Sequence, residues 1–297
     1  MNKQLQGIGA LTLAALIYGM FPIFTRLAGA ELPFYFQNSV RLFIAFFIFL
    51  IATLALKDWK KVRAEDWKWF LLRSTAVFMA FSSFTYTLQF LAIGTMLFTF
   101  YAGSTILGYI IGKFFFGEKL NIRKYVSLGL AVVGLLLIYS INFDPGELLY
   151  LCLAFFSGSC TAVWNIFSKK VSDQYSTSQL NLIDNAIAMV FAIGVSFVFR
   201  EAWVIPTVSI LWLVNLLFGL GIFATGVLMV YGFNRLEGQI GSLIMLSEVL
   251  FAIVLGFLFF KEAVTMTTFI GGSIILLAIV LPELNLLRLH IPIKKKT

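Results

Sequence analysis

Histidine, cysteine, proline and charged residues are all scarce in this chain. The scarcity of histidine and cysteine bears first on metal sites and enzymes. The one histidine, His290, lies in the basic tail, and no group of His, Cys and carboxylate residues has the spacing of a metal site. Motifs such as Gly-x-Ser-x-Gly, His-Glu-x-x-His and the phosphate-binding loop are missing. We therefore expect neither an enzyme nor a bound metal or cofactor.

The composition is too apolar for a soluble domain. Charged residues make up 12% of the chain and hydrophobic residues 60%, whereas charged residues are about a quarter of a soluble protein. The formal net charge of +8 does not indicate nucleic-acid binding, because the basic residues lie in short loops and form no basic face. Cys152 and Cys160 would lie about 12 Å apart on one helix, too far for a disulfide, so we interpret them as packing residues.

The chain consists mostly of long apolar runs separated by short loops. Each run is long enough to cross a bilayer as a helix. The pattern predicts an all-α integral membrane protein with ten transmembrane helices. The runs cover residues 8–28, 35–56, 70–93, 95–116, 124–141, 147–168, 180–199, 209–232, 239–260 and 265–284.

One stretch occurs twice, which indicates an internal duplication. Gly94 to Glu118 and Gly238 to Glu262 align without a gap, 144 residues apart, and share glycines, a Phe-Phe pair and the final glutamate. We predict two five-helix repeats, residues 1–143 and residues 144–297 with a short basic tail. Because each repeat has an odd number of spans, the two are inverted in the membrane, as in many secondary transporters.

Lysine and arginine residues set the predicted orientation. With the N-terminus inside, far more of them fall in cytoplasmic than in outer segments, which is the positive-inside pattern. We expect both termini in the cytoplasm of a bacterial or archaeal inner membrane, and a monomer or homodimer. The cytoplasmic set is Lys3, Lys57, Lys60, Lys61, Arg63, Lys68, Arg73, Lys113, Lys119, Arg123, Lys124, Lys169, Lys170, Arg235, Arg288, Lys294, Lys295 and Lys296.

These features resemble the EamA-type members of the drug/metabolite transporter superfamily. The resemblance covers nearly the whole chain and includes Phe116-Gly117-Glu118, Phe260-Lys261-Glu262 and Leu246-Ser247-Glu248, with Val249 where a proline is usual in the family. It implies ten helices in two repeats. It also implies transport of small metabolites, because the family includes YddG-like aromatic amino acid exporters, drug exporters and some importers.

Glu248 is the sharpest candidate for chemistry. It lies about 14 Å along its predicted helix, where an ionised carboxylate facing lipid would cost several kcal/mol. A carboxylate in low-dielectric surroundings can exchange protons near neutral pH. The residue at the corresponding position of the first repeat, 144 residues earlier, is Ser104, which we call its repeat mate. Glu248 would either couple protons or bind a cationic group, or it would form a structural hydrogen bond to neighbouring helices.

Polar and aromatic residues inside other spans are further candidates. Arg41 would snorkel outward, pair with an acidic residue or hold a substrate carboxylate. Asp184 and Asn185 would belong to an inner gate or substrate site, or to a solvated helix end. The remaining candidates are residues whose polar groups need partners if buried, namely Tyr18, Asn38, Tyr101, Trp164 and Asn165.

Two other sets are interpreted as structural. Glu118 and Glu262 lie at helix ends, where carboxylates cap helices or contact headgroups. Gly108, Gly112 and Gly256 predict close helix packing.

The sequence therefore predicts a secondary transporter that exports small metabolites such as amino acids. It would work by alternating access and be coupled to protons or driven by the substrate gradient. The alternative is export of multiple drugs or cationic compounds, which the aromatic residues and Glu248 would serve through cation–π and charge contacts. A membrane enzyme or scaffold would need a catalytic constellation or an external domain, and the sequence has neither.

Overall fold

The computed structural model describes residues 3–28, 32–87, 90–91, 93–139, 145–261 and 264–283, and the regular secondary structure within these ranges is all helical. The boundary predicted between residues 143 and 144 lies outside the described residues. Helices of the first half are α1 (Lys3–Ala28), α2 (Phe34–Leu56), α3 (Trp67–Thr87), α4 (Ile93–Phe116) and α5 (Ile122–Tyr139). Those of the second half are α6 (Leu148–Ile166), α7 (Thr177–Val198), α8 (Ile210–Phe233), α9 (Gly238–Met245), α10 (Ser247–Phe260) and α11 (Met266–Val280).

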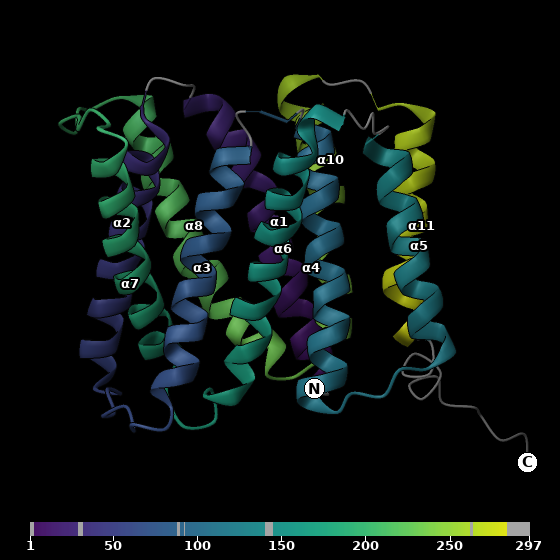
Figure 1. Cartoon of the computed structure of the whole chain (residues 1–297), viewed down its shortest axis with the longest axis horizontal. Coiled ribbons are helices and arrows are strands. Elements are labelled where there is room, and N and C mark those ends of the chain that lie inside the picture. The colour runs from purple at the N-terminus through teal and green to yellow at the C-terminus, as the bar shows by residue number, and fades with distance from the viewer. Residues whose placement is uncertain are drawn as a thin grey trace, which may run out of the picture.

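The helices stand side by side in one bundle (Figure 1). By length and composition alone, seven helical segments of the described chain can cross a membrane, and α11 is a shorter apolar helix. Helices α3 and α5 stand parallel to these segments and cover the same height of the bundle (Figure 1). Helices α9 and α10 together form one span. The predicted all-α membrane fold with ten helices is confirmed.

Helix pairing obeys a pseudo-two-fold symmetry between the halves. The contacts of α1 with α8, of α2 with α8 and of α4 with α6 are matched by those of α6 with α3, of α7 with α3 and of α10 with α1. Helices α2 and α7 pair with each other, as do α5 and α11. Exchanging the helices of one repeat for the corresponding helices of the other therefore gives the same set of helix pairs.

The backbone carries the same duplication at two helix ends. Within the described residues, four positions have a positive φ: Lys57 at 51°, Gly117 at 64°, Arg200 at 53° and Lys261 at 56°. Lys57 and Arg200 are 143 residues apart, and Gly117 and Lys261 are 144 apart. The left-handed conformation satisfies carbonyls at a helix end. Corresponding helices of the two repeats therefore end with a left-handed residue at the same position.

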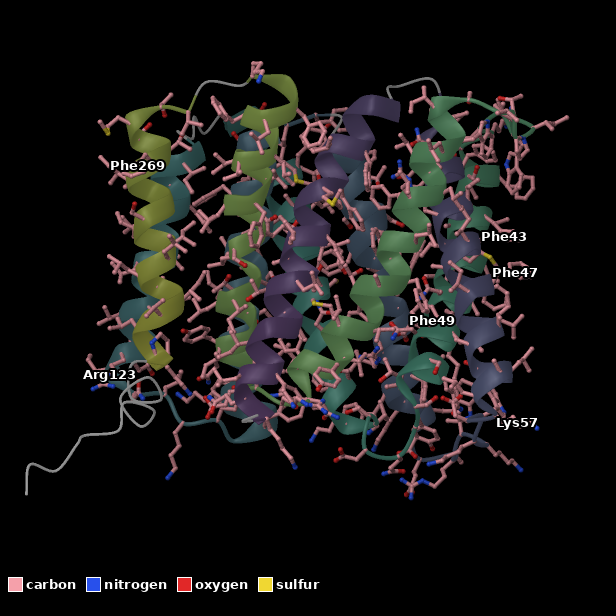
Figure 2. All side chains as sticks on the ribbon, turned by 180° about the vertical axis from the view of Figure 1, so that it is seen from behind. Phe43, Phe47, Phe49, Lys57, Arg123 and Phe269 are labelled. Carbon is pink, nitrogen blue, oxygen red and sulfur yellow. The ribbon has the colours of Figure 1, made fainter. Side chains whose placement is uncertain are left out.

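The two copies of the duplicated stretch run in opposite directions. Helix α4 ends at the end of the bundle where α1 begins, whereas α10 ends at the opposite end (Figure 1). Lys57 and Arg123 also lie at the end where α1 begins, and we call this the basic end (Figure 2). The repeats are therefore inverted, as predicted.

The ninth span is broken at Leu246, although it contains no proline. Helix α9 ends one residue before Leu246 and α10 begins one residue after it. The Ser247 hydroxyl donates to the Ile244 carbonyl at 2.7 Å, and the amide of Leu246 bonds to Leu243 three residues back. A serine that bonds back to its own helix bends it, so Ser247 supplies the physical cause of the break.

Small residues let the helices approach closely. A Cβ added to Gly158 of α6 would lie 1.8 Å from the Phe100 carbonyl oxygen of α4, and one added to Gly108 would lie 2.1 Å from the Ser242 hydroxyl. A Cβ on Gly112 would lie 2.9 Å from Cγ of Gln239 in α9. The prediction of close packing is confirmed for Gly108 and Gly112, and it stays a prediction for Gly256.

The outer surface of the bundle is apolar and aromatic. Phe43 and Phe47 of α2 and Phe269 of α11 point away from the bundle at its two opposite flanks, while Phe49 lies within it (Figure 2). Phe269 keeps 67% of its surface exposed and Phe49 keeps none. Surfaces of this kind face lipid, which accounts for much of the phenylalanine content.

Candidate functional site

Glu248 lies at the start of α10, directly after the break in the ninth span. Tyr101 of α4 forms a hydrogen bond with its carboxyl group. Tyr18 of α1 lies near this carboxyl group and is hydrogen bonded to Thr225 of α8. Glu248 keeps accessible surface, although Ser247 and Val249 on either side are buried. Residues of α1, α4 and α10 thus lie around one carboxyl group, and α8 is linked to them through Tyr18.

The positions of Glu248 and its repeat mate Ser104 are structurally matched. A Cβ on Gly19 of α1 would lie 3.2 Å from the Glu248 carbonyl oxygen, and one on Gly158 of α6 would lie 2.9 Å from the Ser104 amide. The backbones of Glu248 and Ser104 thus each lie beside a glycine of a neighbouring helix, and the contact of α10 with α1 corresponds to that of α4 with α6 when the repeats are exchanged. Ser104 also keeps accessible surface. The internal repeat thus places one carboxyl and one hydroxyl group at corresponding positions of the two halves.

The local helix geometry favours a charge at Glu248. A helix N-terminus carries a partial positive charge, and Glu248 lies in the first turn of α10. Leu246 keeps right-handed helical torsion angles (φ −62°, ψ −17°), so the span is bent at this point rather than unwound. The bend at Leu246 thus places the Glu248 carboxyl group in the first turn of the second segment of the ninth span.

A second polar cluster lies nearer the basic end and joins α3, α6 and α7. Arg73 donates to the Asp184 carboxylate at 2.6 Å and to the Trp164 carbonyl at 2.7 Å. The Trp164 indole donates to the same carboxylate at 3.0 Å, and so does the Ser74 hydroxyl. Both charged side chains are only 1% exposed. Asp184 is therefore no solvated helix end, and that alternative of the prediction is wrong.

Arg73 is the residue that the sequence reasoning missed. We counted it among the cytoplasmic loop residues, but it lies within α3 and is fully buried. The signal was its place inside the apolar run 70–93, with an acidic residue at similar depth in the seventh run. An intramembrane charge is stable only when it is paired, so Arg73 and Asp184 could have been matched on that ground.

Arg41 forms the third cluster, in the half of the bundle away from the basic end. It is 7% exposed and donates to the side-chain oxygens of Asn215 at 2.9 Å and Gln37 at 2.7 Å. Its guanidinium lies 3.9 Å from the centroid of the Phe218 ring. A buried position excludes the prediction that Arg41 snorkels into water.

The other predicted residues are tied to neighbouring helices or to their own. Asn38 donates to Thr85 of α3 at 2.8 Å. Asn185 is buried and donates to the Asn181 carbonyl one turn earlier, at 2.7 Å. Asn165 is buried beside Trp164. The candidates thus divide among the three clusters and structural contacts, and their roles in transport stay predictions.

Glu118 caps a helix of the other repeat. Its carboxylate accepts hydrogen bonds from the amides of Gly238 at 2.6 Å and Gln239 at 3.2 Å, at the start of α9. Lys169 donates to it at 3.0 Å. The prediction that Glu118 caps a helix is confirmed, whereas Glu262 lies outside the described residues. This contact joins the fourth, sixth and ninth spans at the basic end.

Comparison with known proteins agrees with this architecture. The sequence model of the EamA-like transporter family matches residues 5–140 and 148–282, one match for each repeat. The chain belongs to the EamA-like transporter family. Family membership makes it a multi-pass membrane protein that transports a small-molecule substrate.

Relatives of this EamA-like transporter span the whole chain. The uncharacterized transporter YoaV of Bacillus subtilis (strain 168) is 26% identical over 291 residues, which cover 93% of this chain and 94% of the relative. An uncharacterized transporter of Archaeoglobus fulgidus is 24% identical over 281 residues, with 93% and 95% covered. A crystal structure described only as that of a protein has a TM-score of 0.80 at 17% identity and covers 97% and 98% of the two chains, which supports the fold alone.

Proposed function

We propose that this EamA-like transporter is a secondary carrier that exports small organic metabolites, amino acids among them, by alternating access. The observation that supports this most is Glu248, an acidic residue at the break of a discontinuous span where the repeats meet. Substrate and coupling-ion sites of inverted-repeat carriers are found at such places. The proposal includes no catalytic step.

The inverted pairing supports alternating access. The packing of α3 on α6 and α7 has a mate in the packing of α8 on α1 and α2. When one set loosens and the other tightens, a site between them opens to one side and then to the other. Because the two sets are built from equivalent helices, the two states can have similar free energies.

We propose that Glu248 exchanges a proton during the cycle. Its hydrogen-bond partner Tyr101 carries a hydroxyl, which can donate to the charged carboxylate and accept from the protonated one. Contact with water favours the charged state of a carboxyl group, and apolar surroundings favour its neutral state. Opening to either side changes that balance, which couples proton release to the direction in which the site faces.

Purified protein in proteoliposomes tests this function. We expect wild-type protein to exchange amino acids across the bilayer and to move protons with them, detected by an internal pH-sensitive dye. Glu248→Gln removes the exchangeable proton and is expected to abolish proton movement. Glu65→Gln is the matched control, because the Glu65 side chain is 68% exposed. If Glu248→Gln transports at an unchanged rate with unchanged pH dependence, Glu248 does not carry the proton.

Export of cationic compounds is the second candidate. Two aromatic residues, Tyr18 and Tyr101, lie beside the Glu248 carboxyl group, and a carboxylate beside aromatic faces suits a quaternary ammonium group. Binding of a quaternary ammonium dye compared with aromatic amino acids separates the two candidates. A protein that binds only the dye belongs to the second class.

We propose that the basic end faces the cytoplasm of the inner membrane and that both termini lie there. Lys57 and Arg123 lie at this end (Figure 2), and basic residues are retained on the cytoplasmic side of membrane proteins. The protein is expected to act as a monomer or homodimer. Protease accessibility of a tag at either terminus in oriented vesicles tests the orientation.

A further inference from the structure

Lysines and aromatic side chains gather at the basic end, where α3 begins, α4 ends and the short helix η2 (Phe167–Lys170) follows α6. Phe167 of η2 stacks on Trp69 of α3, with ring centroids 5.5 Å apart. It also packs edge-to-face on Phe115 and Phe116 of α4, at 5.1 and 5.9 Å. We call these four rings the interfacial aromatic cluster, and it joins α3, α4 and the end of α6.

Three lysines place their ammonium groups over two of these rings. The ammonium groups of Lys68 and Lys170 lie 5.2 and 5.7 Å from the centroid of the Trp69 ring. Lys170 also lies 4.8 Å from the centroid of the Phe116 ring, and Lys169 lies 5.3 Å from the same centroid. Like charges gathered around two rings repel one another, so an anion among them is stabilised.

Only one of the three ammonium groups has a carboxylate partner within the described part of the chain. Lys169 is paired with Glu118 at 3.0 Å. Lys170 donates to the Phe115 carbonyl at 3.5 Å, and neither Lys170 nor Lys68 forms an ion pair with a described residue. Two positive charges beside one indole ring therefore remain for an external anion.

The acidic residue nearest to Lys68 along the chain is already engaged. Asp66 lies two residues before Lys68, and its carboxylate accepts hydrogen bonds from Arg63 at 2.8 Å and from the Tyr175 hydroxyl at 2.6 Å. Its charge is thus balanced inside the loop that precedes α3.

The lysines lie at the level where the spans end, next to side chains that face lipid. Phe114 and Phe115 belong to the last turn of α4 and are both exposed. Long lysine side chains at a helix end reach the headgroup region, and tryptophan is typical of the same level. The arrangement therefore offers positive charge to a headgroup and apolar rings to the acyl chains beside it.

We propose that Lys68 and Lys170 bind the phosphate of an anionic phospholipid whose acyl chains lie against the exposed phenylalanines at the end of α4. This inference goes beyond the proposed carrier function and does not rest on it. Charge complementarity selects an anionic lipid, because a zwitterionic headgroup brings a cation of its own. The exposed rings select a lipid over free phosphate, since free phosphate has no apolar part to bury.

Native mass spectrometry of purified full-length protein in detergent tests the site. The probes are phosphatidylglycerol and phosphatidylcholine with the same acyl chains. We expect wild-type protein to bind its first phosphatidylglycerol at least about tenfold more tightly than phosphatidylcholine, because two lysines act on one headgroup. In the double variant Lys68→Gln/Lys170→Gln the two affinities are expected to agree within about twofold.

Matched variants separate this site from the net charge of the protein. Lys57→Gln/Lys61→Gln removes the same charge from two exposed residues at the same end, and it is expected to keep the preference. Lys68→Arg/Lys170→Arg keeps the charge and is expected to keep it too. A preference that survives Lys68→Gln/Lys170→Gln would overturn the proposal. Equal loss in the Lys57 and Lys61 control would also overturn it, as would wild-type protein without any preference.

Thermal unfolding distinguishes a lipid from a soluble anion. We expect phosphatidylglycerol to raise the melting temperature of wild-type protein but not that of Lys68→Gln/Lys170→Gln, because a ligand of the folded state adds stability. Inorganic phosphate, compared with chloride at equal ionic strength, is expected to change neither. If inorganic phosphate gives the same lysine-dependent rise, the site binds a soluble anion and the lipid proposal is wrong.

Discussion

Arg73 and Asp184 form an ion pair at 2.6 Å in the interior of the bundle, although 111 residues separate them in sequence. Trp164 and Ser74 complete the hydrogen bonds of the carboxylate, so three helices are joined around one charge. Removing one partner of a buried pair leaves the other charge without compensation. The pair therefore stabilises the contact between α3, α6 and α7 that the proposed cycle has to open.

We expect Arg73→Met and Asp184→Asn each to lower the free energy of unfolding by about 3–5 kcal/mol, and the double variant to lose less than the sum. Thermal unfolding in detergent measures this. Lys68→Met, an exposed residue on the same helix, is the control and is expected to stay within about 0.5 kcal/mol of wild type. Additive losses in the double variant would show that the pair is not coupled.

Gly158→Ala is expected to destabilise the protein, because its methyl group would lie 1.8 Å from the Phe100 carbonyl oxygen and force α4 and α6 apart. Overpacking of this kind costs about 1–3 kcal/mol. Gly129→Ala in α5 is the matched control, since nothing lies within 4 Å of its added Cβ. The melting temperatures of the two variants are compared, and equal values would contradict the close approach of α4 and α6.

The loop before α3 is expected to make the protein sensitive to acid. Hydrogen bonds from Arg63 and Tyr175 lower the pKa of the Asp66 carboxyl from its ordinary value of 3.8. A lowered folded-state pKa adds stability above the unfolded pKa, and this stability is lost as the pH falls through the folded pKa.

Asp66→Asn should therefore be less stable than wild type at neutral pH, and the difference should shrink as the pH falls below about 4. Melting temperatures across that range measure this, with Glu65→Gln as an exposed control. A difference that stays constant with pH would contradict the role of the ionised carboxylate.

Much of the fold follows from the sequence because the bilayer imposes a simple rule. Each span needs a continuous apolar run, so the ten runs predict the helices, and the matched stretches ending at Glu118 and Glu262 predict the inversion. The break at Leu246 was not predicted, because it depends on one hydrogen bond from the Ser247 hydroxyl to the Ile244 carbonyl. Competition of this kind is decided by local geometry rather than by composition.

The candidate site was predictable only in part. Glu248 was identified because a lone acid inside an apolar run is costly. The pairing of Arg73 with Asp184, and the contact of Arg41 with Phe218, join residues from distant spans and leave no periodic pattern in the sequence. Arg73 was misplaced because basic residues near the start of an apolar run usually belong to the loop.

Accessibility of a cysteine at position 104 tests alternating access most directly. Ser104→Cys is placed in a background with Cys152→Ser and Cys160→Ser, and oriented vesicles are treated with a membrane-impermeant thiol reagent from either side. The carrier account predicts labelling from both sides, which a transported substrate slows, because position 104 is the repeat mate of Glu248 and faces each side in turn. Labelling from one side only would contradict it.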